Sequence, residues 1–225
     1  MNYAKRVSAV FLPCLLATFC IAALGATSAQ AEGNWLLEGT SIKESMGFEG
    51  EKDSASYQFL VPKLNLELVF TEFSIDKGVL GTGGEGTEEL LFTKGQVYQI
   101  SPLELMPCGV GNLTFKVKTK LFLHKGKTYD LLSPAENGIL TETTYWDEGG
   151  GCPLGKKNNV TGSLVLEDPK VGFEEGAVTH LVQQAPAALF PEHAMLFGTN
   201  SMTLDGSWTM MLNGKNKGLK WSGIG

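Results

Sequence analysis

Polar and apolar residues alternate along much of the chain, with the period of two that is typical of β-strands. The alternation is clearest over residues 64–71 and 113–121, where apolar side chains occupy every second position. Each stretch therefore predicts a strand with one buried face and one hydrated face. Shorter strand-like runs occur at 34–38, 56–61, 88–93, 96–100, 128–132, 139–145, 160–167, 177–183, 201–212 and 219–221.

Glycine, proline and asparagine separate these runs and predict tight turns. The run from Gly81 to Gly86 predicts a hairpin loop, and Asn213-Gly214 is the sharpest hairpin signal. Only residues 183–195 could hold a helical turn, and two prolines interrupt them. The pattern predicts an all-β fold, an antiparallel β-sandwich or barrel of about ten strands. Residues 32–225 are expected to form a single domain, with a boundary in the acidic segment 167–176 as the alternative.

The N-terminus has the features of a secretory signal peptide. Lys5 and Arg6 precede an apolar run over 7–24, and Ala29-Gln30-Ala31 offers the small residues that signal peptidase needs. We therefore predict a signal peptide at residues 1–31 and a mature chain that begins at Glu32. An uncleaved membrane anchor is the alternative. Cleavage would give an exported protein in the periplasm, at the cell surface or outside the cell, without a transmembrane helix.

Charge excludes some classes of partner. The chain has 18 basic and 24 acidic residues, and Arg6 is its only arginine. Removal of residues 1–31 would leave 194 residues with 16 lysines against 24 acids, a net charge of −8. A mature chain without arginine lacks the planar fork that binds phosphates and base edges in pairs of hydrogen bonds. We therefore expect no nucleic-acid partner.

Two cysteines would remain after export. Cys14 and Cys20 lie in the predicted signal peptide, which leaves Cys108 and Cys152 as a pair. In an exported protein such a pair is expected to form a disulfide, closing a loop of 44 residues (152 minus 108). Two ligands of a metal site are the alternative, but neither cysteine has a histidine or another cysteine close by in sequence. We predict no metal and no cofactor.

The sequence shows no catalytic motif, and we predict no catalytic residue. His124, His180 and His193 lie in separate segments without partners at metal or triad spacing, so we expect His180 on a strand face and the others in surface turns. Acidic residues cluster at 49–53, 85–89 and 147–148. These clusters lack the spacing of a calcium loop, and we interpret them as hydrated turns.

One segment has the composition of a binding site. Tyr145, Trp146, Asp147 and Glu148 precede three glycines, and Cys152 follows closely. Flat apolar faces beside hydrogen-bond acceptors are suited to sugars. The alternative is that Tyr145 points inward and Trp146 covers the edge of the core. The other tryptophans, at positions 35, 208 and 221, lie in apolar alternation and are expected in the core.

Several segments together resemble a large group of uncharacterised exported bacterial all-β proteins. They are Asn34-Trp35-Leu36-Leu37-Glu38-Gly39, the glycine-rich run 81–86 before the strand-like 90–93, the segment 204–207, and Trp221. The resemblance implies a bacterial exported β protein and transfers no functional residue. Members of the group often carry more cysteines than the two expected here.

These observations favour an exported, non-catalytic β domain that binds a surface glycan or a partner protein at the cell envelope. A secreted hydrolase is an alternative, and it would need a histidine or a pair of acids to converge in a pocket. A small outer-membrane barrel and a barrel that carries an apolar ligand are the others. An enclosed apolar cavity, a solid core or an outward apolar belt about 25 Å tall would each select a different one of these hypotheses.

Overall fold

The two longest strands form the central hairpin of the fold. Strands β5 (Leu66–Leu80) and β6 (Glu85–Gln99) have 15 residues each and pair along nearly their whole length. A short turn, η2 (Thr82–Gly84), joins them, and its glycines adopt positive φ angles. This computed structural model describes residues 33–225, so the predicted signal peptide and Glu32 lie outside the described residues.

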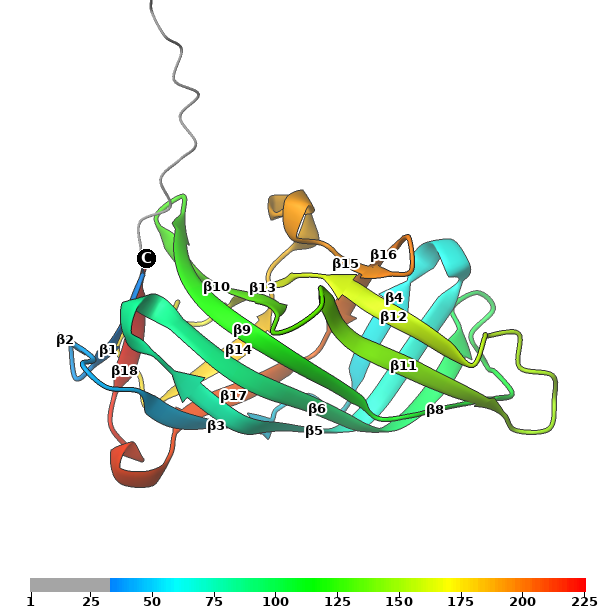
Figure 1. The fold of residues 1–225 in the computed structure, drawn as a ribbon, viewed down its shortest axis with the longest axis horizontal. Coiled ribbons are helices and arrows are strands. Elements are labelled where there is room, and N and C mark those ends of the chain that lie inside the picture. Colours follow the sequence, from blue (N-terminus) through cyan, green and yellow to red (C-terminus); the bar gives the residue numbers. More distant parts are fainter. Residues whose placement is uncertain (1–32) are drawn as a thin grey trace, which may run out of the picture.

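Eight antiparallel strands close into a barrel (Figure 1). Neighbouring strands follow the order β6-β9-β10-β13-β14-β17-β3-β5, and the β5–β6 pairing closes the ring. The prediction of an all-β antiparallel fold is therefore confirmed, with a barrel as its form. Besides β5 and β6, the barrel strands are β3 (Met46–Lys52), β9 (Leu113–His124), β10 (Lys127–Pro134), β13 (Leu164–Glu167), β14 (Thr179–Gln184) and β17 (Ser207–Leu212).

The sheet continues beyond the barrel at one end of the molecule. The C-terminal half of β5 pairs with β3 in the barrel, while its N-terminal half pairs with β4. From β4 the extension runs through β16, β15, β12 and β11 to β8, which returns to β6 near Gly95. Its strands are β4 (Tyr57–Val61), β8 (Cys108–Val110), β11 (Ile139–Asp147), β12 (Lys157–Gly162), β15 (Met195–Phe197) and β16 (Asn200–Asp205), and β7 (Glu104–Leu105) pairs with the end of β6.

A small sheet covers the opposite end of the barrel (Figure 1). It consists of β1 (Asn34–Leu37), β2 (Thr40–Ser41) and β18 (Trp221–Ile224). The ring centroids of Trp35 and Trp221 are 5.5 Å apart, and Trp35 and Phe173 form a T-shaped pair with centroids 6.1 Å apart. Under this aromatic cap, buried Asp168 and His180 form a hydrogen bond.

Aromatic side chains fill the interior. Phe92 of β6 is fully buried and packs against Tyr57, Phe59 and Phe115, among others. The three tryptophans expected in the core are 0–1% exposed. Within residues 33–225, none of the helices has the length and apolar character needed to cross a membrane.

Several local predictions were wrong. The predicted runs 160–167 and 201–212 each form two strands, β12 with β13 and β16 with β17. β3 was not predicted, because Gly47 and Gly50 interrupt its alternation. The predicted runs 88–93 and 96–100 form one strand, since Lys94 takes a left-handed conformation (φ 58°) within β6 without ending it. Asn213-Gly214 does not turn a hairpin, because both edges of β17 are already paired, with β14 and with β3. The chain instead continues through η5 (Gly214–Asn216) towards β18.

Candidate functional site

The exposed indole of Trp146 lies directly over a glycine of the neighbouring strand. Trp146 of β11 is the register partner of Gly109 of β8. A Cβ atom on Gly109 would lie 2.0 Å from Cε2 of the indole and 2.1 Å from Nε1. Any side chain at position 109 would therefore displace the ring, so the missing Cβ is what seats Trp146 on the backbone of β8.

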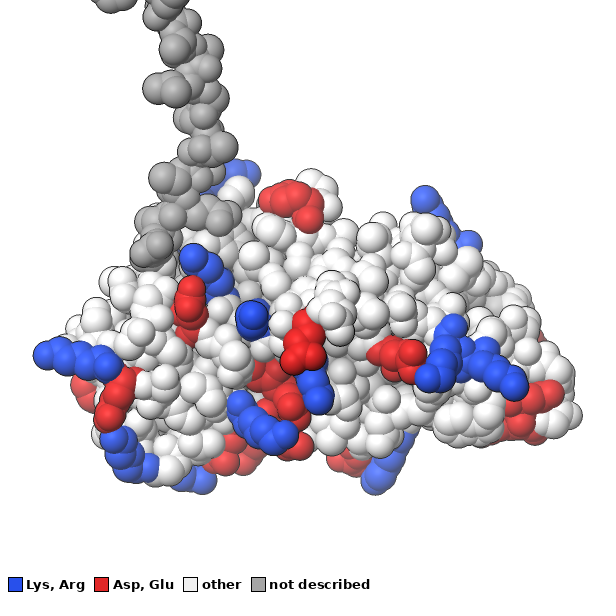
Figure 2. Space-filling model, viewed as in Figure 1, with Lys and Arg blue, Asp and Glu red and all other residues white. Residues whose placement is uncertain are grey.

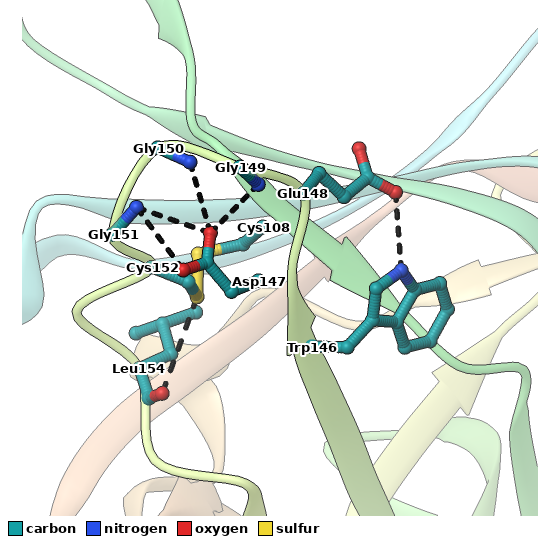
Figure 3. The surroundings of a disulfide bond; sticks show 9 residues. All are labelled: Cys108, Trp146, Asp147, Glu148, Gly149, Gly150, Gly151, Cys152 and Leu154. Carbon is teal, nitrogen blue, oxygen red and sulfur yellow. Dashed lines mark hydrogen bonds between the residues drawn. A yellow bond between two sulfur atoms is a disulfide. The ribbon is translucent and has the colours of Figure 1, made fainter.

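A hydrogen bond fixes the edge of the same ring. The indole Nε1 of Trp146 donates to Oε1 of Glu148 at 3.2 Å (Figure 3). Trp146 remains 51% exposed, although its ring is fixed both by packing on Gly109 and by the hydrogen bond to Glu148. Tryptophan side chains are more often largely buried. Beside it lies a surface hollow of about 480 Å³, which Leu154 and Lys156 also line. The result is an ordered aromatic platform with a carboxylate at its edge, and we call Trp146 and Glu148 the platform.

The Asp147 side chain stabilises the glycine loop that follows it. Its Oδ1 accepts hydrogen bonds from the backbone N–H groups of Gly149, Gly150 and Gly151 at 2.9–3.0 Å (Figure 3). These donors, Gly150 and Gly149 foremost, lower the pKa of Asp147 from its usual value. The carboxylate predicted as a ligand acceptor is thus occupied in ordering the glycine loop.

The predicted disulfide anchors this loop. Cys108 and Cys152 are bonded, with Cα atoms 5.0 Å apart. Cys108 is also the register partner of Asp147, so the bridge ties the end of the loop to β8 beside the platform. Tyr145 is 5% exposed and its ring packs near Phe197, so it belongs to the core. Of the four predicted binding residues, Trp146 and Glu148 are left free to meet a ligand.

Polar side chains continue the platform along β11 and β12. Register partners in an antiparallel pair share a face, and every second residue of a strand points the same way. Thr144 therefore faces outward with Lys157, and Glu142 with Asn159. Lys157 Nζ donates to Glu142 Oε1 at 2.7 Å. The platform is thus one end of a polar strip that runs along the sheet.

No known protein family, curated protein or solved structure matches this chain. The resemblance to exported bacterial all-β proteins stays a prediction. The chemistry of the described residues is accordingly the basis for assigning a function.

The three histidines lie in different settings. The prediction of a surface turn was wrong for His124, which ends strand β9 with its ring against Phe190. His180 is fully buried on β14, where its Nδ1 lies 2.8 Å from Asp168 Oδ2 and its Nε2 lies 2.9 Å from the Trp221 carbonyl oxygen. His193, in η4 (Pro191–His193), is partly exposed, and its Nδ1 lies 3.2 Å from the hydroxyl of Ser163. No group of three or more histidine, cysteine or acidic side chains within residues 33–225 could hold a metal ion.

One predicted hydrated turn contains a buried acid instead. Glu88 lies within β6 and is 3% exposed, whereas its neighbour Glu89 faces outward and lies near Lys77 and Lys116. Successive residues of a strand point to opposite faces, so the adjacent Glu88 and Glu89 lie on opposite sides of the sheet. Asp130 of β10 is buried as well, at 2% exposure. Sequence position alone did not distinguish these two acids from surface carboxylates.

Proposed function

We propose that the protein is a non-catalytic β-barrel protein that binds an oligosaccharide at the Trp146–Glu148 platform, as an exported protein at the cell envelope. The observation that carries this proposal is the exposed indole seated over Gly109, with its edge held by Glu148. A pyranose ring has a flat C–H face that stacks on an aromatic ring and hydroxyls at its rim that donate to a carboxylate.

Pre-organisation strengthens this proposal. A tryptophan that is ordered before binding loses little side-chain entropy when a ligand stacks on it. The polar strip of Thr144, Lys157, Glu142 and Asn159 offers further hydrogen-bonding groups to an extended ligand. Acidic and basic side chains are interspersed over the face in Figure 2, without an area of one sign that would favour a highly charged ligand.

Intrinsic fluorescence tests the proposal on the full chain. Of the four tryptophans, positions 35, 208 and 221 are buried and Trp146 is exposed, so a quencher such as acrylamide should report mainly on Trp146. A glycan array would first identify candidate oligosaccharides, and each binder should then protect the fluorescence from quenching. Trp146→Ala should remove binding, whereas Leu105→Ala, which truncates an exposed apolar side chain (59%) of β7, should keep it.

Two results would contradict the proposal. One is a glycan array without signal for the wild-type protein. The other is oligosaccharide binding that Trp146→Ala leaves unchanged. Capture of a protein partner that depends on Trp146, with no glycan binding, would instead support the hypothesis of a protein ligand.

One observation favours the hydrolase alternative. The hydroxyl of Ser163 lies within hydrogen-bonding distance of His193, and Glu192 Oε1 lies 3.9 Å from the other ring nitrogen. A serine beside a histidine is the pairing that activates a nucleophile. Phenylmethylsulfonyl fluoride should label wild-type protein and spare Ser163→Ala if this pair is reactive. Equal labelling of both proteins, or none, would leave the pair a structural contact.

A further inference from the structure

Three buried polar side chains form a diagonal row inside the barrel. Glu88 of β6 is level with Val117 of β9, and Thr119 is the next inward-facing residue along β9. Asp130 of β10 is level with Leu121, one inward position further on. Each step therefore moves one strand sideways and two residues along, a separation of about 7–8 Å between Cα atoms. We call Glu88, Thr119 and Asp130 the interior row.

Four side-chain oxygens of the interior row lack hydrogen-bond partners within the described part of the chain. Its members are 2–4% exposed. Both carboxyl oxygens of Glu88, the Thr119 hydroxyl and Oδ1 of Asp130 have no partner there. Buried polar groups are nearly always paired, so four orphan oxygens from three adjacent strands are exceptional.

No cation among residues 33–225 faces the interior row. Asp168 and His180, from β13's end and β14, face the same interior but are paired with each other. Tyr129 of β10 packs in a separate cluster with Phe122 and Phe190. The remaining titratable acidic, lysine and histidine residues of the neighbouring strands lie on the outer face or at a strand end: Glu67, Glu72, Asp76 and Lys77 of β5, Glu85, Glu89 and Lys94 of β6, Lys116, Lys118, Lys120 and His124 of β9, Lys127 of β10 and Glu167 of β13. Glu67 is 8% exposed and the others are exposed or half-buried.

Ionising both Glu88 and Asp130 in the closed barrel interior costs free energy, because burial removes each anion from bulk water and no cation among the described residues faces it. Burial raises the pKa of Glu88 well above its usual range, and the charge of Asp130 raises it further. Burial raises the pKa of Asp130 to about 7, although the Lys120 backbone opposes part of that rise. Both groups are therefore held as neutral acids in acidic solution, and Asp130 begins to ionise near neutral pH.

We propose that the interior row is a pH-responsive layer, which keeps the β6–β9–β10 side of the barrel closed in acid and lets it open locally in mild alkali. When the carboxyls lose their protons, each anion needs water or a cation that the closed interior does not supply. Separation of β9 from its neighbours admits water to all three residues, because β9 is the middle strand of the row.

The direction of the pH effect follows from proton linkage. In the unfolded chain Glu88 and Asp130 ionise near their ordinary values of 4.5 and 3.8, while the folded protein retains their protons to higher pH. The folded state therefore binds more protons than the unfolded state, and its stability falls as the pH rises. The stabilising contribution is complete below about pH 4 and is lost as the pH passes through 7 and above.

Denaturation at several pH values tests the layer. Between pH 6 and pH 9 the unfolding equilibrium constant of the wild-type protein should rise at least about tenfold. Glu88→Gln/Asp130→Asn, which cannot ionise at these positions, should remove most of that rise. Glu89→Gln is the matched control, because it neutralises the adjacent but outward-facing acid, and it should retain the wild-type profile. Parallel profiles for the wild-type protein and the double variant would overturn the proposal.

A second measurement needs no variant and applies if the double variant fails to fold. Hydrogen exchange of the wild-type protein, corrected for the intrinsic effect of pH, should show protection lost in β9 and β10 between pH 6 and pH 9. Protection in β15 and β16, which lie in the extension and do not pair with β6, β9 or β10, should persist. Infrared spectra should show protonated carboxyl groups at pH 6 that disappear by pH 9. Uniform exchange across the strands, or no protonated carboxyl at pH 6, would refute the layer.

Discussion

Oδ2 of Asp168 lies 2.8 Å from Nδ1 of His180, and both side chains are fully buried. The second oxygen of Asp168 accepts the backbone N–H groups of Lys170 and Val171, and the second nitrogen of His180 faces the carbonyl of Trp221. One pair of side chains therefore connects the turn after β13, strand β14 and the C-terminal strand β18.

Loss of Asp168 should be severely destabilising. Asp168→Ala leaves a buried imidazole and two backbone donors without their acceptor, and we expect a loss of about 3–5 kcal/mol in the free energy of unfolding. Urea denaturation measures it. Asp205→Ala, at an exposed carboxylate of β16, should change stability by no more than about 0.5 kcal/mol. A loss below about 1 kcal/mol for Asp168→Ala would show that the pair is dispensable.

The seat of Trp146 can be tested without changing the tryptophan. Gly109→Ala places a methyl group where the indole lies and should move the ring, giving altered acrylamide quenching and the same loss of oligosaccharide binding as Trp146→Ala. Gly155→Ala is the control, since open space surrounds that position. In a Trp146→Ala background, Gly109→Ala should have little further effect on stability. Unchanged binding by the Gly109→Ala protein would argue against a seated platform.

The disulfide should stabilise the whole fold. Cys108→Ser/Cys152→Ser opens a loop of 44 residues, for which the chain-entropy estimate is a loss of about 4 kcal/mol. Urea denaturation should show the same loss in the free energy of unfolding for the double variant and for the wild-type protein treated with a thiol reductant, each compared with the untreated wild-type protein. If the reduced protein were as stable as the oxidised one, the bridge would not contribute to folding.

Export should remove residues 1–31. Mass spectrometry of the protein expressed with its natural N-terminus in a bacterial host should give a mature chain that begins at Glu32, because Ala29 and Ala31 meet the requirement of signal peptidase. Ala31→Lys should block processing at this site. A mature chain that retains Met1 would contradict the prediction of a cleaved signal peptide.

Local patterns predicted the strands better than their partners. Alternation at 113–121 anticipated β9 and its lysine face, because a half-buried strand repeats its environment every two residues. Closure of the barrel depends on pairing between β5 and β6 and on β17 joining both β14 and β3. Such pairings bring together residues far apart in sequence, and one-strand periodicity carries no information about them.

For the candidate site, too, the sequence indicated the local segment but not its partner strand. The composition of 145–148 singled out an aromatic and acidic segment, and strand alternation then turned Tyr145 inward and Trp146 outward. The contribution of Gly109 depends on a register between β8 and β11 that the sequence does not display. The interior row was missed because Glu88 sits beside Glu89 in a segment whose composition is that of a surface turn.

The two long strands of the central hairpin also decide how the protein can be divided. The edge of β5 opposite β6 pairs with β3 along its C-terminal half and with β4 along its N-terminal half, so no cut through β5 leaves either part with a complete sheet. The barrel and its extension should accordingly melt together in a single cooperative transition, and neither should be recoverable as an isolated fragment. Barrel and extension must therefore be inherited, exchanged or engineered as one piece.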